Sequence, residues 1–133
     1  MAEQSVPDSA RVVIIGGGVI GCSIAYHLTR LGWQDVVLLE RDRLTCGTTW
    51  HAAGLITTLR HTENQTRLAK YSQELYRTLE SETGLSTGFR QIGSIQLATT
   101  DEREQELRRG CDMAHCFGVE FHEISAEEVK QRW

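Results

Sequence analysis

The chain of 133 residues is long enough for one domain with a hydrophobic core. Its 14 basic and 18 acidic residues give a formal net charge of -4, and the basic residues form no stripe, so we expect no nucleic-acid partner. No apolar run approaches the roughly 20 residues of a membrane span. Residues 1–10 lack the basic and apolar parts of a targeting segment, and we expect a disordered leader before a domain of residues 11–133.

The first predicted strand, Arg11–Ile15, is a short apolar run of the kind that buried parallel strands show. Gly16, Gly18 and Gly21 follow it with the spacing G-x-G-x-x-G and open a predicted helix over Gly18–Leu31. The first glycine permits a tight turn, the second lets a pyrophosphate approach the backbone, and the third lets the helix lie close to the strand. The free N–H groups at the helix N-terminus favour the same anion.

A second strand, Val36–Glu40, ends in an acid about 20 residues after the glycines. The carboxylate of Glu40 can accept hydrogen bonds from the ribose hydroxyls of an adenosine. Ala25 and Leu28 fall on the helix face expected to pack against the sheet. The order strand, glycine turn, helix, strand and acid predicts a Rossmann-like α/β fold that binds an adenine dinucleotide.

An irregular loop is expected over Arg41–Thr49, and it leads into a run of small and polar residues beside the crevice that holds the dinucleotide. The threonines of this run offer hydroxyl groups, its small residues leave the backbone open to a ligand, and neutral imidazole is a nucleophile. Trp50 is expected either to cover a ring of the cofactor or to pack in the core. The run consists of Gly47, Thr48, Thr49, Trp50, His51, Ala52, Ala53 and Gly54.

The next helix is predicted over Glu63–Thr83, with Gly84 ending it. Its apolar residues recur at the spacing of an amphipathic helix, and the stripe that they form is expected to lack part of its cover in this chain. A strand is predicted over Gly93–Ala98, where apolar residues alternate with polar ones so that one face is buried. The helical stripe consists of Leu68, Tyr71, Leu75 and Leu79, and the buried strand face of Ile95 and Leu97.

A further helix is predicted from Asp101 to about Phe117, and Val119–Glu123 is expected to be extended. Ser125–Glu128 has the sequence of a capping box, which predicts the start of a last helix. Because that helix is cut short at Trp133, we expect an incomplete domain, the N-terminal part of a longer protein with the start of a second α+β layer.

The four cysteines form no C-x-x-C pair, and free thiols are expected. Cys111, His115 and Cys116 cluster in the sequence, but three candidate ligands are too few for a structural metal site. Cys111 and His115 also fit the buried stripe of a helix, so a packing role is expected and no metal is predicted.

Five segments together resemble the N-terminal part of the dimethylglycine and sarcosine dehydrogenases, which are FAD-dependent amine oxidoreductases of the D-amino-acid-oxidase-like superfamily. The resemblance covers nearly the whole chain from Arg11 onward, and the T-W-H-A-A-G motif at 49–54 is its most specific part. The resembling segments are 12–21, 25–28, 37–40, 47–55 and 93–99.

The resemblance implies that His51 bonds covalently to the 8α-methyl of the flavin. It also implies that Val19 and Ile20 line the pyrophosphate, that Glu40 and Arg41 meet the adenosine, and that residues 47–55, ending at Leu55, wrap the flavin side. Cys46 is the other residue of this region able to anchor a flavin, but the family uses histidine here.

The implied reaction is oxidation of the N-methyl group of dimethylglycine or sarcosine by hydride transfer to flavin N5, with the catalytic residues later in the complete chain. The product iminium then hydrolyses or is captured by tetrahydrofolate in a separate C-terminal domain. An electron-transfer flavoprotein or oxygen would reoxidise the flavin. The chain alone is expected to be inactive, and the complete enzyme to be cytoplasmic in a bacterium or in the mitochondrial matrix of a eukaryote.

Two alternatives remain open. An NAD-dependent dehydrogenase shares the glycine fingerprint and the acid, but a nicotinamide site has no use for Trp50 and His51 in this loop. A non-catalytic homologue would resemble the regulatory subunit of pyruvate dehydrogenase phosphatase, which lacks the histidine of the motif. The presence of His51 favours the enzyme.

Overall fold

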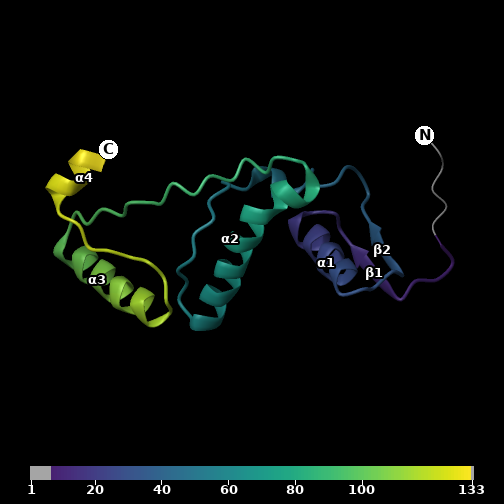
Figure 1. Ribbon diagram of the computed structural model, residues 1–133, viewed down its shortest axis with the longest axis horizontal. Helices are drawn as coiled ribbons and strands as arrows, with labels where there is room; N and C mark the ends of the chain where they lie inside the picture. Colours follow the sequence, from purple (N-terminus) through teal and green to yellow (C-terminus); the bar gives the residue numbers. More distant parts are fainter. Residues whose placement is uncertain (1–6, 133) are drawn as a thin grey trace. The chain divides into compact units, whose positions relative to one another are not determined.

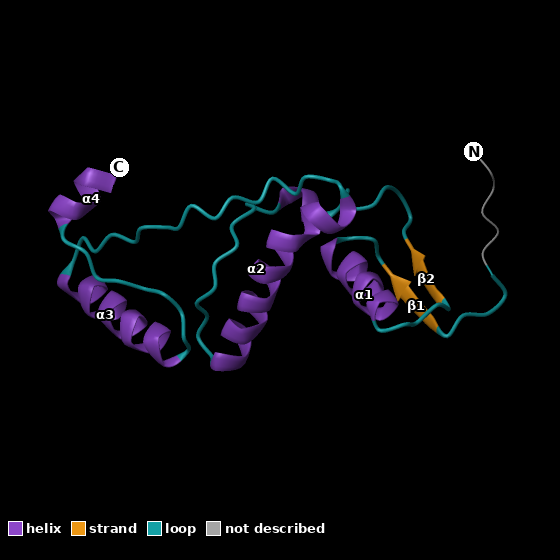
Figure 2. Ribbon diagram, in the orientation of Figure 1, coloured by secondary structure: helices purple, strands orange, loops and turns teal. Residues whose placement is uncertain are grey.

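The computed structural model describes residues 7–132, and the chain divides into two compact units, Met1–Leu55 and Ile56–Trp133 (Figure 1). The expected leader therefore lies partly outside the described residues. Both described strands belong to the first unit, and the described part of the second unit contains helices and loops (Figure 2). Among the described residues, none of the helices has the length and apolar character needed to cross a membrane.

The first unit is a strand–helix–strand motif. Strands β1 (Val12–Ile15) and β2 (Val36–Leu39) are parallel, with Val12 opposite Val36 and Ile15 opposite Leu39. Parallel neighbours need a crossover connection, and helix α1 (Val19–Arg30) supplies it. The Gly16 N–H extends the ladder by donating to the Leu39 carbonyl at 2.8 Å. These elements agree with the predicted ones to within one residue at each end.

The core of the first unit lies between α1 and the strand pair. Ile14 is only 7% exposed, and Ala25 and Leu28 on α1 are half-buried, as the helical periodicity predicts. At the far end of the motif, the Arg11 guanidinium lies 4.0 Å from the centroid of the Trp33 ring. Because the apolar face of α1 packs on the two strands, the N-terminus of α1 lies at the carboxyl ends of β1 and β2.

The longest helix of the second unit, α2 (Glu63–Thr83), has the predicted bounds. The Thr62 hydroxyl accepts from the Gln65 N–H at its start, and Gly84, with a φ of +71°, ends it in the left-handed conformation. Its apolar stripe is only partly buried, because Leu75 and Leu79 are half-buried whereas Leu68 and Tyr71 are 67% and 52% exposed. This partial burial agrees with the expectation that the stripe lacks part of its cover.

The predicted strand Gly93–Ala98 is absent from the described residues, and this segment runs as a loop between α2 and α3 (Figure 2). Ile95 and Leu97 are 41% and 63% exposed, so the expected buried face is wrong as well. Alternation of apolar and polar residues marks two faces, but a strand also needs a neighbouring backbone for its hydrogen bonds. The described residues provide none here, and the described part of the second unit contains helices and loops.

Two shorter helices complete the described chain, α3 (Asp101–Cys116) and α4 (Ala126–Arg132). The N-cap of α3 is Thr100, one residue before the expected start. The predicted capping box of α4 is confirmed: the Ser125 N–H donates to the Glu128 carboxylate at 2.8 Å, and the Glu128 N–H donates to the Ser125 hydroxyl at 3.2 Å. Residues 119–123, expected to be extended, form a loop in which Glu123 pairs with Arg108 at 3.1 Å.

Candidate functional site

Consecutive glycines close the turn between β1 and α1. Gly16 has a φ of +103°, a region that residues with a Cβ rarely adopt. A Cβ at Gly21 would lie 1.9 Å from the Gly16 carbonyl oxygen, so only glycine lets the first turn of α1 pack against the end of β1. Both glycines have the structural roles that their spacing predicts.

Gly17, which the glycine spacing does not single out, is also constrained at this turn. It is buried, its N–H donates to the Glu40 carboxylate at 2.7 Å, and its carbonyl accepts from the Thr45 N–H at 2.8 Å. A Cβ added here would lie 2.5 Å from Leu44 Cδ2 and 3.1 Å from Glu40 Cβ. The run of three glycines was the only available signal, because G-x-G-x-x-G leaves its second position free.

Glu40 follows β2 directly and faces the glycine turn. One carboxylate oxygen accepts from the Gly17 N–H, and the other accepts from the Asp42 N–H at 3.1 Å. The Gly17 hydrogen bond, and after it the Asp42 one, holds the pKa of the Glu40 carboxyl below its ordinary value. The group is therefore ionised at neutral pH, and each oxygen keeps a lone pair that a ribose hydroxyl could use.

A cavity of about 320 Å³ opens at the carboxyl ends of the two strands. This is the position at which open α/β sheets bind their ligands. Its lining combines apolar strand ends with Glu40 and Arg41, which suits an adenosine with its ribose hydroxyls. The lining residues are Ile15, Gly16, Leu39, Glu40, Arg41, Cys46 and Gly47.

The end of the loop after β2 is more regular than predicted, because Thr48–His51 forms one turn of 3-10 helix. The Trp50 N–H donates to the Gly47 carbonyl at 3.1 Å, and the Ala52 N–H donates to the Thr49 carbonyl at 3.2 Å. This turn holds Thr49, Trp50 and His51 in one compact segment. We call residues 48–51 the attachment turn, after the flavin attachment that the sequence leads us to expect at His51.

The attachment turn reaches the N-terminus of α1 through one side chain. The Val19 N–H donates to the Thr49 hydroxyl oxygen at 2.9 Å. Gly18, the N-cap of α1, contributes no side-chain cap of its own. A Cβ at Gly18 would lie 3.1 Å from the same hydroxyl oxygen, so the open space above this glycine is where Thr49 approaches.

The remaining residues of the motif lie at the surface. Trp50 and Leu55 are 78% and 81% exposed, and His51 and residues 52–54 are exposed as well. Within the described part of the chain, the His51 imidazole has no hydrogen bond, and Gly54 has a φ of +74°. The structure thus brings Gly17, Glu40, Val19 and Thr49 together, whereas Trp50 and His51 face outward from the same segment.

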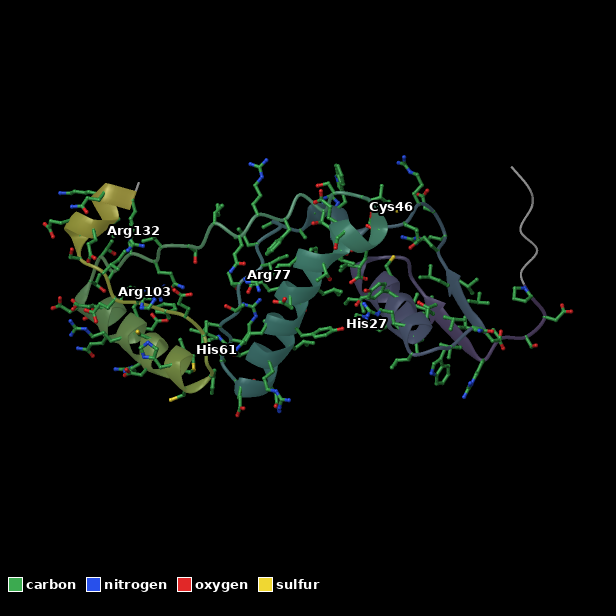
Figure 3. The ribbon with its side chains drawn as sticks, viewed as in Figure 1. His27, Cys46, His61, Arg77, Arg103 and Arg132 are labelled. Carbon is green, nitrogen blue, oxygen red and sulfur yellow. The ribbon has the colours of Figure 1, made fainter. Side chains whose placement is uncertain are left out.

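All four cysteines are free. Cys46 is exposed on the loop after β2 (Figure 3). The Cys22 thiol donates to the Gly17 carbonyl at 3.4 Å. Cys111 is half-buried, as expected, but His115 is exposed, so its expected place in a buried stripe is wrong. Over residues 7–132, no three His, Cys, Asp or Glu side chains are grouped so that they could hold a metal ion.

The family model described as FAD dependent oxidoreductase matches residues 11–133. The chain is 44% identical to the mitochondrial pyruvate dehydrogenase phosphatase regulatory subunit of Mus musculus over 127 residues, which cover 96% of the chain and 14% of that protein. It is also 44% identical to the mitochondrial sarcosine dehydrogenase of Mus musculus over 129 residues, with the same shares. The mitochondrial dimethylglycine dehydrogenase of Rattus norvegicus is 46% identical over 124 residues, 93% of the chain and 14% of that protein.

Among solved structures, the glycine oxidase of Geobacillus kaustophilus matches with a TM-score of 0.76 and 28% identity. The match covers 92% of the chain and 35% of the oxidase. This likeness and the parallel strand pair confirm the predicted Rossmann-like α/β fold. The chain spans about one seventh of the length of these three curated relatives, at 14% of each.

Proposed function

The chain belongs to the family of FAD-dependent oxidoreductases, and from this premise we propose that its first unit holds the adenosine and pyrophosphate of FAD. The observation that carries the proposal is the convergence of Gly17, Glu40 and the α1 N-terminus at the carboxyl ends of the strands. Glu40 and Arg41 would meet the adenosine at the 320 Å³ cavity. The pyrophosphate would lie at the N-terminus of α1, where the N–H groups of Ile20 and Gly21 have no acceptor among the described residues.

For the whole protein we propose oxidation of the N-methyl group of a glycine derivative, either sarcosine or dimethylglycine. Support comes from the names of two relatives, sarcosine dehydrogenase and dimethylglycine dehydrogenase. FAD would supply the hydride acceptor, while the residues of this unit bind and orient it. We propose an electron-transfer flavoprotein or oxygen as the electron acceptor, capture of the product by tetrahydrofolate in a further domain, and a mitochondrial location in a eukaryote.

We also propose that FAD is joined covalently to His51. The attachment turn presents His51 at the surface with its imidazole unengaged, two residues after the hydroxyl that contacts the α1 N-terminus. Joining an imidazole nitrogen to the 8α-carbon replaces one N–H and one C–H bond by a C–N bond. Two protons leave, and two electrons pass through the flavin to dioxygen, which becomes hydrogen peroxide.

The test is made on the full-length gene product. The protein is precipitated with acid, and the flavin in the pellet and in the supernatant is measured by absorbance and by peptide mass. Wild type should keep its flavin in the pellet, His51→Ala should release it, and Cys46→Ser, a change in the same loop, should behave as wild type. Acid-stable flavin in His51→Ala, or its loss in Cys46→Ser, would assign the attachment to another residue.

The second candidate is a non-catalytic regulatory protein, because the pyruvate dehydrogenase phosphatase regulatory subunit is as similar to this chain as sarcosine dehydrogenase is. The two candidates differ in turnover, so the full-length protein is mixed with sarcosine or dimethylglycine and an artificial electron acceptor. Methyl oxidation to formaldehyde supports the enzyme, and FAD binding without turnover supports the regulatory protein. The NAD alternative loses its basis, because the matched family is FAD dependent.

A further inference from the structure

Besides the bond between Gly17 and Glu40, two hydrogen bonds tie the loop after β2 to the glycine turn and to the start of α1. The Thr45 N–H donates to the Gly17 carbonyl at 2.8 Å, and the Val19 N–H donates to the Thr49 hydroxyl at 2.9 Å. The first bond is made by the backbone and is available to any residue except proline. The second depends on a side chain at Thr49, and it is the bond that fixes the attachment turn.

Thr49 acts as a long-range cap for α1. The first N–H groups of a helix have no acceptor inside the helix, and each seeks one elsewhere. Val19 has the first of these groups, and it finds the Thr49 hydroxyl from 30 positions away in the sequence. Ile20 and Gly21 keep their N–H groups without an acceptor among the described residues, so capping by Thr49 leaves donors for a phosphate.

We propose that Thr49 is a positioning residue for flavin attachment: its hydroxyl fixes the attachment turn on the N-terminus of α1 and so sets the place of His51 relative to the pyrophosphate-binding turn. The inference rests on the proposed covalent attachment at His51. A 3-10 helix rises about 2 Å per residue, so His51 lies about 4 Å along the turn from the fixed point. A misplacement of about 1 Å can slow a reaction between positioned groups about 100-fold.

A positioning role for the Thr49 hydroxyl predicts a different experimental result from a role in binding the pyrophosphate. A residue whose main role is to bind the pyrophosphate would weaken FAD binding when its hydroxyl is removed. A residue that positions the attachment turn would leave the reversible affinity nearly unchanged and slow the formation of the covalent bond. The decisive comparison is therefore between reversible affinity and attachment rate in the same variant.

The experiment uses the full-length protein, prepared without flavin and then mixed with FAD in aerated buffer. Thr49→Val keeps the β-branched shape and removes the hydroxyl, and Thr49→Ser restores the hydroxyl. Thr45→Val is the matched control, because Thr45 lies on the same loop, its hydroxyl makes no hydrogen bond within the described residues, and its backbone bond to Gly17 is kept. Reversible binding is measured on a His51→Ala background, and attachment by the growth of acid-stable flavin.

Thr49→Val should attach flavin about 10- to 100-fold more slowly while its affinity for FAD changes less than about threefold. Thr49→Ser and Thr45→Val should attach flavin at the wild-type rate. Attachment by Thr49→Val at the wild-type rate overturns the inference, as does an equal slowing in Thr45→Val or a loss of affinity that matches the loss of rate. Wild type without acid-stable flavin instead overturns the proposed attachment itself, which separates the two failures.

Discussion

The contacts inside the first unit join residues that are far apart in the sequence, whereas most contacts inside the second unit join near neighbours. In the first unit, Gly17 meets Glu40 across 23 positions of sequence, and Val19 meets Thr49 across 30. In the second unit most recorded contacts are helix caps and pairs three or four residues apart, such as Arg77 with Glu74. The exceptions include the bond from Lys70 to the Gly118 carbonyl at 2.8 Å, the bond from Arg77 to Gln91 at 2.9 Å, and the pair of Arg108 with Glu123 at 3.1 Å.

This difference in sequence separation explains why the candidate site lies in the first unit. Polar groups that converge from distant positions create a defined geometry at the strand ends, which a ligand can use. Local caps stabilise individual helices and create no such meeting point. We therefore expect changes in the first unit to affect FAD, and comparable changes in the second unit to affect only the helix in which they occur.

The largest effect is expected for Gly21→Ala. The added Cβ would lie 1.9 Å from the Gly16 carbonyl oxygen, and a backbone atom cannot move aside as a side chain can. We expect a loss of about 3 kcal/mol or more in the stability of the first unit, together with loss of FAD. Hydrogen exchange of the peptides that cover β1 and α1, and the flavin content of the full-length protein, measure both effects.

The matched change in the second unit is Gly110→Ala, inside α3. A Cβ there would meet no atom within 4 Å, and alanine is the better helix former. This variant should slow exchange in α3, by up to about 1 kcal/mol in local stability, and should keep its flavin. Equal behaviour of the two glycine variants would mean that the close approach at Gly21 does not constrain the fold.

The next largest effect is expected on the affinity for FAD when Glu40 is changed. On a His51→Ala background, where the flavin is bound reversibly, Glu40→Gln should weaken FAD binding about 10- to 100-fold, the scale of hydrogen bonds to a charged group. Glu102→Gln on α3 is the control, since the Glu102 pKa is also lowered, chiefly by its own backbone N–H. Unchanged affinity in Glu40→Gln would mean that backbone groups hold the ribose.

The pH dependence follows from the direction of the Glu40 shift. The Gly17 hydrogen bond, followed by the Asp42 one, lowers the folded-state pKa from its ordinary 4.5, so the stabilisation is present above about pH 4.5 and is lost as the pH falls through the folded value. On the same His51→Ala background, flavin fluorescence should therefore report release of the reversibly bound flavin below pH 4.5 in the protein that keeps Glu40. Glu40→Gln should lack this transition, and a transition that persists would assign it to another group.

The sequence predicted those parts of the molecule that local signals determine. The helix bounds, the two strands, the capping box at Ser125 and the roles of Gly16 and Gly21 follow from periodicity, caps and glycine spacing. The constraint at Gly17 and the Val19–Thr49 hydrogen bond were not predicted, because no local pattern indicates which distant side chain will hydrogen-bond to a turn. The strand at Gly93–Ala98 was predicted wrongly, because alternation cannot show whether a partner backbone is present.

The smallest effect is expected for Ser125→Ala, which removes one half of the capping box of α4. The Glu128 N–H would lose its acceptor at 3.2 Å, and loss of an N-cap hydroxyl costs about 1 kcal/mol of helix stability. The Ser125 N–H bond to the Glu128 carboxylate would remain, so α4 should fray rather than unfold. Hydrogen exchange should rise in residues 126–132 alone, while flavin content and exchange around α1 stay at wild-type values. A loss of flavin in this variant would contradict the expectation that changes in the second unit leave FAD binding by the first unit unaffected.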